Sequence, residues 1–422
     1  MDHSSSTSTL RLPTGWKTVT VGDVVVDAQS GFASGERDDN GILQLRMNNI
    51  DTAGHVVLDT YLKVPVPKDI GRYILKPKDV LFNNTNSVDL IGKTALFQGE
   101  CDYCTYSNHI TRLRVDDSQV TSEWLTLCLM KKWQHRYFAR ICARHVGQAG
   151  IRNEELLKTE IPLPPLSEIQ CIAPIIITVD NAIQKSKVAT EETERLKQGA
   201  MRGLLTKGIG HTEFKKGGSH GVAPKEWNIV YLSQISKIRY GLGQPPEKDD
   251  NGVPMIRATD IDRGNVDMRN ALKIKRDRIP NGRSPYLKPG EIIVVRSGVN
   301  TGDLALYLPE YGEAIAGYDL VISPERETVD PRFLTYYLLG DAAQTYFKKQ
   351  SARAAQPHLN SEQLGALKVP APQMSEQKKI ATILSTIDRK IDLQHQRTAT
   401  LKRLQQGLMN DLLTGRRRVV TA

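Results

Sequence analysis

The sequence predicts an α+β fold in which two mixed α/β domains are joined by two long antiparallel helices that form a coiled coil. Three observations lead to this class: an internal repeat, a heptad pattern inside the repeat, and short β-rich runs outside it. Residues 162–206 and 370–414 align at a constant offset of 208 without a gap, and 19 of the 45 aligned positions are identical. Unrelated segments would match at only a few positions, so the chain has an internal pseudo-two-fold repeat.

The repeat extends into the regions that precede the two helices. Trp16 corresponds to Trp227, and the Asp-Asp-Asn-Gly sequence of residues 38–41 recurs at residues 249–252. We therefore expect seven segments in chain order: a disordered tail (1–14), a first domain (15–164), a long helix (165–206), a linker (207–223), a second domain (224–372), a second long helix (373–414) and a basic tail (415–422).

Both domains have a mixed pattern. Residues 24–26, 79–82 and 291–295 are β-rich runs bounded by turn-forming residues, whereas residues 122–144 and 331–349 are typical of helices. This alternation predicts an α+β class for each domain, with the order of the strands left open.

The long helices have clearer signals. Each follows a proline-containing segment and a serine that can cap the first free amides, Ser167 with Gln170 three residues later, and Ser375. In the second copy, apolar residues recur at alternating steps of four and three, which is a heptad seam. Pro174 interrupts the second turn of the first copy and predicts a kink. The residues predicted to pair the helices are Ile172, Ile176, Val179, Ile183, Leu196, Leu204, Ile380, Leu384, Ile387, Ile391, Leu401, Leu408 and Leu412.

A long helix with one narrow apolar seam needs a partner to bury it. The second copy is the simplest partner, and it would pack antiparallel because a whole domain lies between the two helices in the sequence. The alternative is that each helix lies separately on its own domain.

Composition limits the partners. A net charge of +10 and a pI near 9.2 favour a polyanion, and charge alone would suit RNA, DNA or a membrane surface equally. A two-fold repeat favours duplex DNA. The longest apolar run, residues 172–177, is too short to cross a membrane, and residues 1–13 lack the apolar stretch of a signal peptide. We expect a cytoplasmic protein with no membrane partner.

The five cysteines are Cys101, Cys104, Cys128, Cys142 and Cys171. An odd number of cysteines, all in the first half of the chain, does not indicate a disulfide framework. This distribution is consistent with a protein of the reducing cytoplasm. Cys101 and Cys104 form a CxxC pair close to His109, but a zinc site usually needs a second pair. We expect two thiols in a surface loop and no metal.

The repeated helices carry a resemblance to a known family. Residues 162–168 and 370–377 are proline-rich entries with a Ser-Glu pair, and residues 204–206 and 412–415 share a Leu-Leu-Thr ending. The segments Ser375–Ile380 and Ile387–Ile391 are closest to the family. In this layout the chain is similar to the specificity subunit of type I restriction–modification systems, and the resemblance covers nearly its whole length.

The resemblance implies a function without catalysis by the chain itself. Each domain would be a target-recognition domain that reads one half of a bipartite, asymmetric site in double-stranded DNA. The helices would act as a spacer and as a dock for two methyltransferase subunits, through which the restriction (translocase) subunits attach. No cofactor is implied for the chain.

The candidate catalytic and cofactor-binding motifs in the sequence are incomplete. Residues 91–94 read Ile-Gly-Lys-Thr, but Ser87 stands where a phosphate-binding loop requires glycine, and the second repeat has Asp303 in place of the lysine. Residues 240–245 lack the third glycine of a dinucleotide fingerprint. We also find no adenine-methyltransferase motif and no HExxH zinc motif, so we expect a protein that is not an enzyme.

The candidate DNA-reading residues are side chains that can bond base edges, because Arg pairs with guanine and Asn or Gln with adenine in the major groove. In the first domain they are Arg37, Arg46, Asn48, Asn83, Asn84, Asn86 and Gln148. In the second domain they are Gln244, Arg257, Arg296, Ser297, Asn300, Arg353 and Gln356. Phosphate contacts are expected from Lys273, Lys275, Arg276 and Arg278. Arg46 and Arg257 occur in both copies, so a structural role is the alternative for them.

A rival hypothesis is a coiled-coil scaffold whose two domains bind proteins. DNA binding would weaken steeply with salt, and this separates the two hypotheses.

Overall fold

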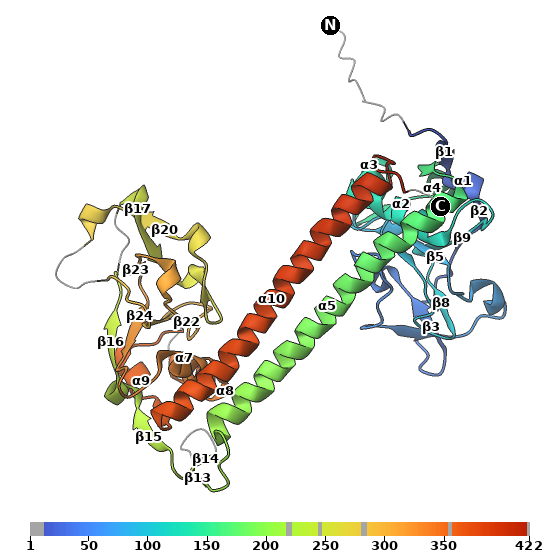
Figure 1. Cartoon of the computed structure of the whole chain (residues 1–422). Helices are drawn as coiled ribbons and strands as arrows, with labels where there is room; N and C mark the ends of the chain where they lie inside the picture. The colour runs from blue at the N-terminus through green and yellow to red at the C-terminus, as the bar shows by residue number, and fades with distance from the viewer. Residues whose placement is uncertain (1–11, 217–221, 244–246, 280–284, 353–356, 420–422) are drawn as a thin grey trace. The chain divides into compact units, whose positions relative to one another are not determined.

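The computed structural model describes residues 12–216, 222–243, 247–279, 285–352 and 357–419. The chain forms two compact units, Met1–Ser186 with Arg397–Ala422 (unit 1) and Lys187–Gln396 (unit 2). Two long helices, α5 (Leu166–Lys207) and α10 (Met374–Leu412), each contribute one half to each unit (Figure 1). Each unit also contains one globular part, built from strands and short helices.

Each globular part is built on a four-stranded antiparallel sheet with the same strand order. In unit 1 the order is β2 (Val25–Ser30), β9 (Ile110–Val115), β5 (Val80–Asn83) and β7 (Thr94–Leu96). In unit 2 it is β16 (Ser236–Tyr240), β24 (Leu320–Pro324), β21 (Ile292–Val294) and β22 (Leu304–Leu306). Strand β21 and residues 80–82 of β5 are continuous apolar runs because both of their faces are buried, whereas β9 also contains Arg112 and Arg114.

A second, three-stranded sheet is also shared. Its order is β4 (Leu62–Val64), β3 (Ile42–Leu45) and β8 (Cys104–Tyr106) in unit 1, and β20 (Leu272–Ile274), β17 (Lys248–Ile256) and β23 (Ile315–Ala316) in unit 2. In both, the central strand has one antiparallel and one parallel neighbour. The strand pairs β1 (Lys17–Thr20) with β12 (Glu160–Leu163), and β15 (Asn228–Tyr231) with β25 (Lys368–Ala371), join the beginning and the end of each globular part. This common topology confirms two mixed α/β domains that repeat one fold.

The remaining elements complete the globular parts. In unit 1 they are α1 (Val21–Val24), β6 (Thr85–Asn86), α2 (Ser122–Gln134), α3 (Tyr137–Ile141), β10 (Ala143–His145), β11 (Gln148–Gly150) and α4 (Asn153–Leu157). In unit 2 they are β13 (Phe214–Lys216), β14 (Val222–Pro224), α6 (Leu232–Ile235), β18 (Ile261–Asp262), β19 (Asn265–Val266), α7 (Pro331–Leu339), α8 (Asp341–Ser351) and α9 (Ser361–Gly365). Short 3₁₀ helices span Met47–Asn49, Ile70–Tyr73, Ala258–Asp260, Met268–Asn270, Arg276–Arg278 and Pro309–Tyr311.

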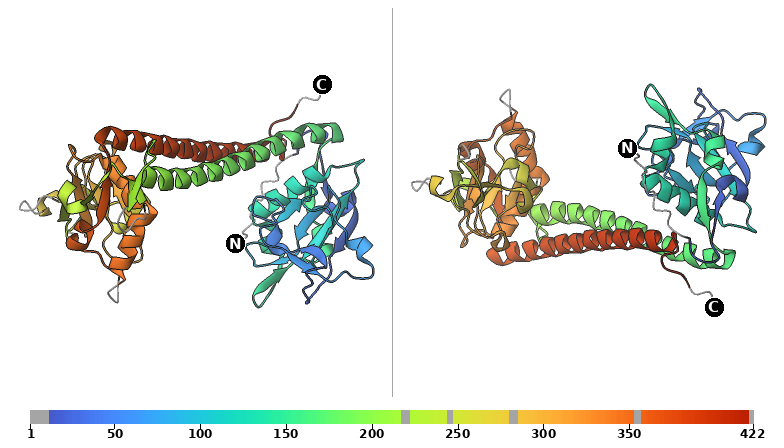
Figure 2. Two further views of the ribbon diagram at one scale, coloured as in Figure 1. Left: turned by 90° about the horizontal axis from the view of Figure 1, so that it is seen from below. Right: turned by 90° about the horizontal axis from the view of Figure 1, so that it is seen from above.

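Helices α5 and α10 are antiparallel neighbours within each unit (Figures 1 and 2). In unit 1, Ser186 Oγ lies 2.8 Å from Thr398 Oγ1, and Gln405 Nε2 donates to Asp180 Oδ1 over 2.9 Å. In unit 2, Gln394 Nε2 donates to the Ala189 carbonyl over 3.3 Å, and Lys197 Nζ lies 2.5 Å from Asp388 Oδ1. Residue numbers rise along one helix as they fall along the other, which confirms the antiparallel pair. The helices do not lie separately, each on its own domain.

The pairing surface changes character along its length. Near the helix ends it is apolar: Ile172, Ile176, Leu408 and Leu412 pack in the core of unit 1, and Leu204, Ile380 and Leu384 pack in the core of unit 2. Ile183 is buried, and Val179, Ile387, Ile391 and Leu401 are half-buried. Leu196, predicted to pair the helices, is instead 58% exposed. In the middle, α5 buries Ser186, Thr190 and Thr193, so hydrogen bonds replace part of the apolar seam there.

The helices begin two residues earlier than capping by the serines predicts. Ser167 and Ser375 lie inside the first turns, so neither serine is the N-cap. The Pro165 carbonyl accepts the amides of Glu168 and Ile169, and the Gln373 carbonyl has the same role in α10. Helix α5 is continuous through Pro174, and the kink at that residue stays a prediction.

A tryptophan–glutamate pair joins the start of each globular part to the start of a long helix. Trp16 Nε1 donates to Glu168 Oε2, and Trp227 Nε1 donates to Glu376 Oε2, both over 3.0 Å. The segment after each opposite helix adds a second donor, Arg418 for Glu168 and His211 for Glu376. Glu168 is buried and Glu376 is half-buried, and each of them accepts an indole N–H and a second polar contact.

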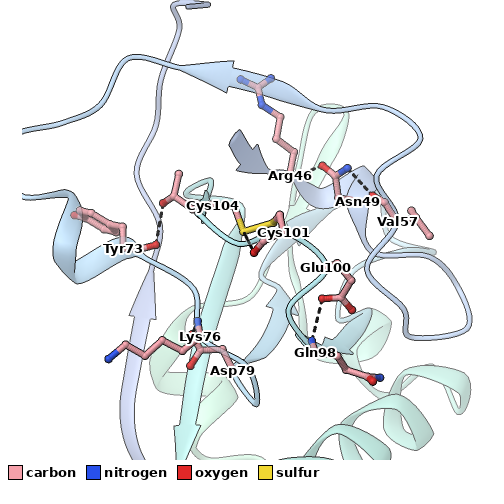
Figure 3. The surroundings of a disulfide bond; sticks show 11 residues. Arg46, Asn49, Val57, Tyr73, Lys76, Asp79, Gln98, Glu100, Cys101 and Cys104 are labelled. Atoms are coloured by element: carbon pink, nitrogen blue, oxygen red, sulfur yellow. Dashed lines mark hydrogen bonds between the residues drawn. A yellow bond between two sulfur atoms is a disulfide. The ribbon is translucent and has the colours of Figure 1, made fainter. Parts of the chain in front are cut away.

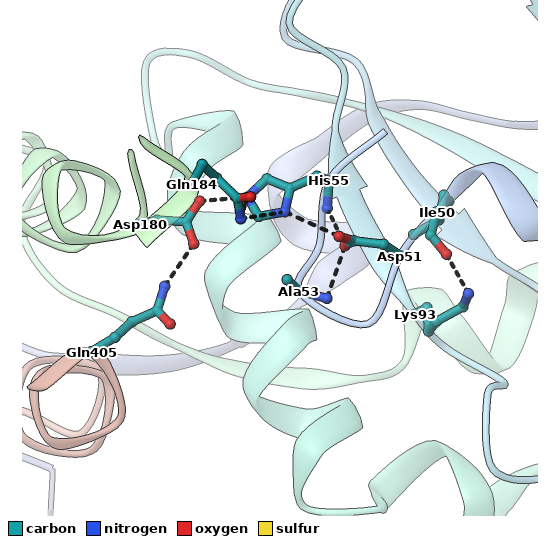
Figure 4. Close-up of polar contacts among 8 residues, drawn as sticks. All are labelled: Ile50, Asp51, Ala53, His55, Lys93, Asp180, Gln184 and Gln405. Carbon is teal, nitrogen blue, oxygen red and sulfur yellow. Dashed lines mark hydrogen bonds and ion pairs between the residues drawn. The ribbon is translucent and has the colours of Figure 1, made fainter. Parts of the chain in front are cut away.

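A second repeated carboxylate connects each globular part to its helix. In unit 1, Asp180 lies 2.5 Å from His55 Nε2, and His55 Nδ1 lies 3.4 Å from Asp51 (Figure 4). In unit 2 the equivalent Asp388 accepts from Tyr336 Oη over 2.6 Å. Hydrogen bonds to Asp180 and then Asp51 raise the pKa of His55 to about 9, so it is an imidazolium at neutral pH. This charge links the globular part of unit 1 to α5.

The CxxC pair differs from the expectation of two free thiols. Cys101 and Cys104 are joined by a disulfide next to β8 (Figure 3). Their spacing brings the Cα atoms to 6.1 Å, within the range that a disulfide spans. No group of three or more His, Cys, Asp or Glu side chains in the described segments could hold a metal ion.

Helix α5 is also long and apolar enough, by length and composition alone, to cross a membrane. The core helix of a soluble protein passes the same test, and Ile172, Ile176 and Ile183 of α5 are buried against protein.

Candidate nucleic-acid interface

Equivalent positions follow the central strands β5 and β21. The Ile151 amide donates to the Asn84 carbonyl over 2.8 Å, and the Leu359 amide donates to the Arg296 carbonyl over 2.7 Å. Asn84 and Arg296 therefore occupy the same backbone position in the two units. Their side chains differ completely in chemistry, as expected of a position that is free to vary within a fixed scaffold.

In unit 1 this position is part of a closed network. Asn84 Nδ2 donates to the Asn108 carbonyl over 3.1 Å and to Thr111 Oγ1 over 2.9 Å. Asn83 Nδ2 donates to the Met47 carbonyl, and Asn86 Oδ1 accepts the Ser87 amide. All three asparagines are buried. Their amides are used inside the domain, so the structure contradicts their selection as base-reading residues.

In unit 2 the equivalent position holds a stacked arginine. The guanidinium carbon of Arg296 lies 4.7 Å from the ring centre of Tyr240 and 4.3 Å from that of Tyr318. Both rings are more than one-third exposed, and Arg296 is half-buried between them. Cation–π contact on two sides restricts the guanidinium to one plane. We call Arg296, Tyr240, Tyr318 and His358 the arginine seat.

His358 completes the arginine seat. Arg296 Nη2 lies 2.9 Å from His358 Nε2, which accepts the hydrogen bond when the imidazole is neutral. Burial and the neighbouring Arg296 charge lower the pKa of His358, so the neutral form is favoured at physiological pH. Within the described residues, Arg296 Nε is buried without a hydrogen-bond partner. The seat therefore orients a planar donor group of the kind that pairs with guanine.

Arg46 and Arg257 serve the fold. The Arg46 amide donates to Asn49 Oδ1 over 2.9 Å, and the Arg257 amide donates to Asp260 Oδ2 over 3.0 Å. The guanidinium of Arg257 also bonds Asp260, and that of Arg46 reaches the Ser34 carbonyl. Both arginines hold equivalent turns after β3 and β17, which favours the structural alternative.

The predicted phosphate contacts form one basic strip along β20 and the 3₁₀ turn after it. Lys273 and Arg278 are exposed, and Lys275 lies 3.8 Å from Glu247. Arg276 is partly neutralised because its Nη1 donates to Glu313 Oε1 over 3.1 Å. Lys273 and Arg278 are thus the better placed of the four to meet a phosphate.

The other candidate readers divide by exposure. Arg37, Asn48, Gln148 and Asn300 are exposed, and Ser297 is half-buried beside the seat, where it bridges to the backbone of His358. Gln244, Arg353 and Gln356 lie outside the described residues. None of the exposed readers in unit 1 lies in a stacked arrangement comparable to the arginine seat among the ring contacts of the described residues.

Sequence reasoning missed Tyr240, Tyr318 and His358. They lie 78 and 40 positions apart along the chain and belong to no local motif. The repeat could have indicated Tyr240, because Ser30 occupies the equivalent strand position in unit 1. The exchange of serine for tyrosine marks a place where the two copies have diverged.

Comparisons with known proteins identify the family. The family described as type I restriction modification DNA specificity domain matches residues 13–193 and 224–403. The MjaX specificity subunit of a type I restriction enzyme from Methanocaldococcus jannaschii is 28% identical over 97% of this chain and 95% of its own length. The EcoBI specificity subunit from Escherichia coli is 27% identical over 54% of this chain and 52% of its own.

Solved structures share the fold. The S subunit of a type I restriction–modification system from M. genitalium superposes with a TM-score of 0.63 at 13% identity, covering 96% of this chain and 98% of that one. A structure from work on complex assembly of the type I R–M system gives 0.53 at 19% identity, with the same coverage of both chains. Because two copies of the family's domain cover most of the sequence, this chain belongs to the family of type I restriction–modification DNA specificity domains.

Proposed function

We propose that this chain is the DNA-recognition subunit of a type I restriction–modification complex, in which each unit reads one half of a bipartite, asymmetric site. Membership in the specificity-domain family supports the recognition role. The basic net charge of +10 supports a polyanionic partner. The assignment of one half-site to each unit rests on the internal repeat.

The observation that carries the proposal is divergence inside a conserved scaffold. The two units share strand order, the Trp–Glu contact and the backbone position of Asn84 and Arg296. They differ in the side chains that surround that position, which are small and hydrogen-bonded in unit 1 but stacked and cationic in unit 2. Two copies that keep the scaffold and change the reading surface are suited to two different half-sites.

The relatives' names suggest the partners. Curated relatives are specificity subunits of restriction enzymes, and one similar structure concerns assembly of the type I complex. By this analogy we propose that α5 and α10 serve as the dock for two methyltransferase subunits, and that restriction subunits attach through them. We also propose that the chain acts in the cytoplasm and has no catalytic activity of its own.

A binding selection tests the proposal. The full purified chain is incubated with a library of randomised duplexes, and the bound fraction is sequenced after several rounds. The expected result is a two-part motif with a constant gap, bound with an affinity that falls steeply between low and physiological salt. A library that yields no motif, or salt-insensitive binding, would exclude sequence reading and favour the protein-binding scaffold.

A further inference from the structure

A basic hairpin distinguishes unit 1. From Glu123 to Glu154 the sequence contains no acidic residue but has Lys131, Lys132, Arg136, Arg140, Arg144 and Arg152. This run forms the end of α2, helix α3 and the hairpin β10–β11. A stretch of thirty residues with six cations and no anion has a locally positive net charge.

Half of this charge is already used inside the domain. Lys131 Nζ donates to the Met409 carbonyl, Lys132 lies over the Tyr137 ring, and Arg136 pairs with Asp89. The other three, Arg140, Arg144 and Arg152, are exposed, and no salt bridge within the described part of the chain involves them. Arg140 Nη2 donates to the His135 carbonyl over 3.4 Å. Arg140 and Arg152 flank the hairpin β10–β11 in sequence, and Arg144 lies within β10.

The hairpin itself is anchored at its base and exposed at its tip. Ala149 is buried in the unit 1 core, and strand β11 pairs with β6 through Ala149 with Asn86 and Gly150 with Thr85. Beyond this base, Arg144 and Gln148 are exposed, and Val146 at the tip is completely exposed. The turn closes through Gly147, whose φ of +80° suits glycine.

Unit 2 builds the same base. The bridge between Ser297 and His358 is the counterpart of the one between Thr85 and Gly150, and it lies directly beside Arg296. This β-bridge is therefore part of the repeated plan, and in unit 2 it lies beside the arginine seat.

We propose that the β10–β11 hairpin enters the major groove of the first half-site, where Gln148 reads an adenine. A two-stranded ribbon fits the major groove, which is about 12 Å wide, and a glutamine amide matches adenine N6 and N7. Arg140, Arg144 and Arg152 contact the phosphates on either side, and Val146 offers methyl groups to a thymine. The inference rests on the proposed function, and it adds which structural element of unit 1 reads the DNA and which groove that element enters.

The test uses selections on the full chain, starting from the wild-type two-part motif. Gln148→Ala should lose the preference at one adenine in one half of the motif, with a roughly 5- to 150-fold drop in discrimination, and leave the other half unchanged. Arg144→Ala should weaken binding on all sequences and reduce the salt dependence by about one ion. Lys158→Ala, which removes an exposed cation at the C-cap of α4, is the matched control and should behave as wild type.

A modified base then identifies the groove. The modified base is placed at the adenine for which Gln148→Ala has lost its preference. There 7-deazaadenine lacks the N7 acceptor in the major groove, so it should weaken DNA binding by the wild type but not by the variant. The melting temperature of Gln148→Ala is first shown to match that of the wild type. If this folded variant then binds all sequences more weakly by the same factor, or binds all of them as the wild type does, the hairpin does not read bases. Insensitivity of the wild type to 7-deazaadenine would likewise overturn the proposal. Absence of any motif for the wild type would instead refute the proposed function itself.

Discussion

At the scale of single residues, burial separates scaffold from reading surface. Asn83, Asn84 and Asn86 have the right chemistry for adenine, yet each uses its amide inside unit 1. Arg296 has the right chemistry for guanine and is also presented between exposed rings. Residue type alone therefore cannot rank candidate readers, because a polar side chain near a turn satisfies the fold as readily as it contacts a base.

Arg296 gives a residue-scale prediction. Arg296→Ala should abolish discrimination at one base pair of the second half-site, a loss of about 1–3 kcal/mol, because the bidentate donor is gone. Arg296→Lys should restore charge but not discrimination, since lysine lacks the planar fork. Competition binding on single-base variants of the selected motif measures both. Arg269→Ala, which removes another exposed arginine of unit 2, is the control. If Arg296→Ala lowers the affinity equally for every sequence, Arg296 contacts phosphate and does not read a base.

His55 gives a prediction about pH. Its folded pKa of about 9 lies above the ordinary value of 6.5, so its stabilising contribution is complete below pH 6.5 and is lost as pH rises towards 9. His55→Gln should therefore lower the free energy of unfolding by about 2–3 kcal/mol at pH 6 and by little at pH 9.5. Denaturant titrations at the two pH values measure it, with exposed His135→Gln for comparison. If the difference in unfolding free energy between the wild type and His55→Gln is the same at both pH values, His55 acts by packing alone.

At the scale of elements, the helices were predictable and the sheets were not. The heptad positions indicated two long helices that pack on each other, because the periodicity of a helix shows which of its faces is apolar. The antiparallel direction followed from the whole domain that lies between the two helices in the sequence. The strand order could not be predicted, since β3 pairs in parallel with β8, which lies sixty residues away. The arginine seat could not be predicted for the same reason. Tyr240 ends β16 and Tyr318 lies two residues before β24, and only the pairing of these strands in the sheet brings the two rings together.

The middle of the helix pair shows where the heptad prediction failed. Leu196 is exposed, whereas Ser186 and Thr190 are buried where apolar residues were due. Hydrogen-bonded polar residues in a pairing surface specify register at a cost in stability. The polar section therefore favours one alignment of α5 against α10.

Cross-linking tests the register. Ser186→Cys combined with Thr398→Cys should form a disulfide under mild oxidation, because the two hydroxyls are 2.8 Å apart. The bond appears as a mobility shift in non-reducing electrophoresis of the full chain. Ser186→Cys combined with Arg403→Cys, which places the second thiol more than one turn away, should not cross-link at the same rate. Equal rates for the two pairs would contradict the alignment.

At the scale of the whole molecule, the repeat separates recognition from spacing. Each unit carries its own sheet and its own Trp–Glu contact. Under the proposed function each unit also has its own DNA-reading surface, and one surface can change without disturbing the other. Under the proposed function, α5 and α10 set the gap between the two half-sites. The two roles are then open to independent change.

Lengthening the helices tests the spacing role. Seven residues inserted after Ser186 in α5, with seven inserted before Arg397 in α10, keep the heptad phase and add about 10 Å of helix. The gap in the selected motif should then grow by about three base pairs at 3.4 Å each, while both half-sites stay the same. Inserting the same heptad in α5 alone is the control, because it breaks the pairing register. If the spacing between the two half-sites does not change, the helices do not set that spacing.

The central claim is that two independent readers share one chain, and a domain exchange measures it directly. Residues 15–161 are replaced by the equivalent domain of a relative, and the variant is expressed in cells with its methyltransferase partners. Sequencing that detects methylated bases then gives the modified motif. The account predicts a new first half-site, an unchanged second half-site and an unchanged gap. A motif altered in both halves would contradict it.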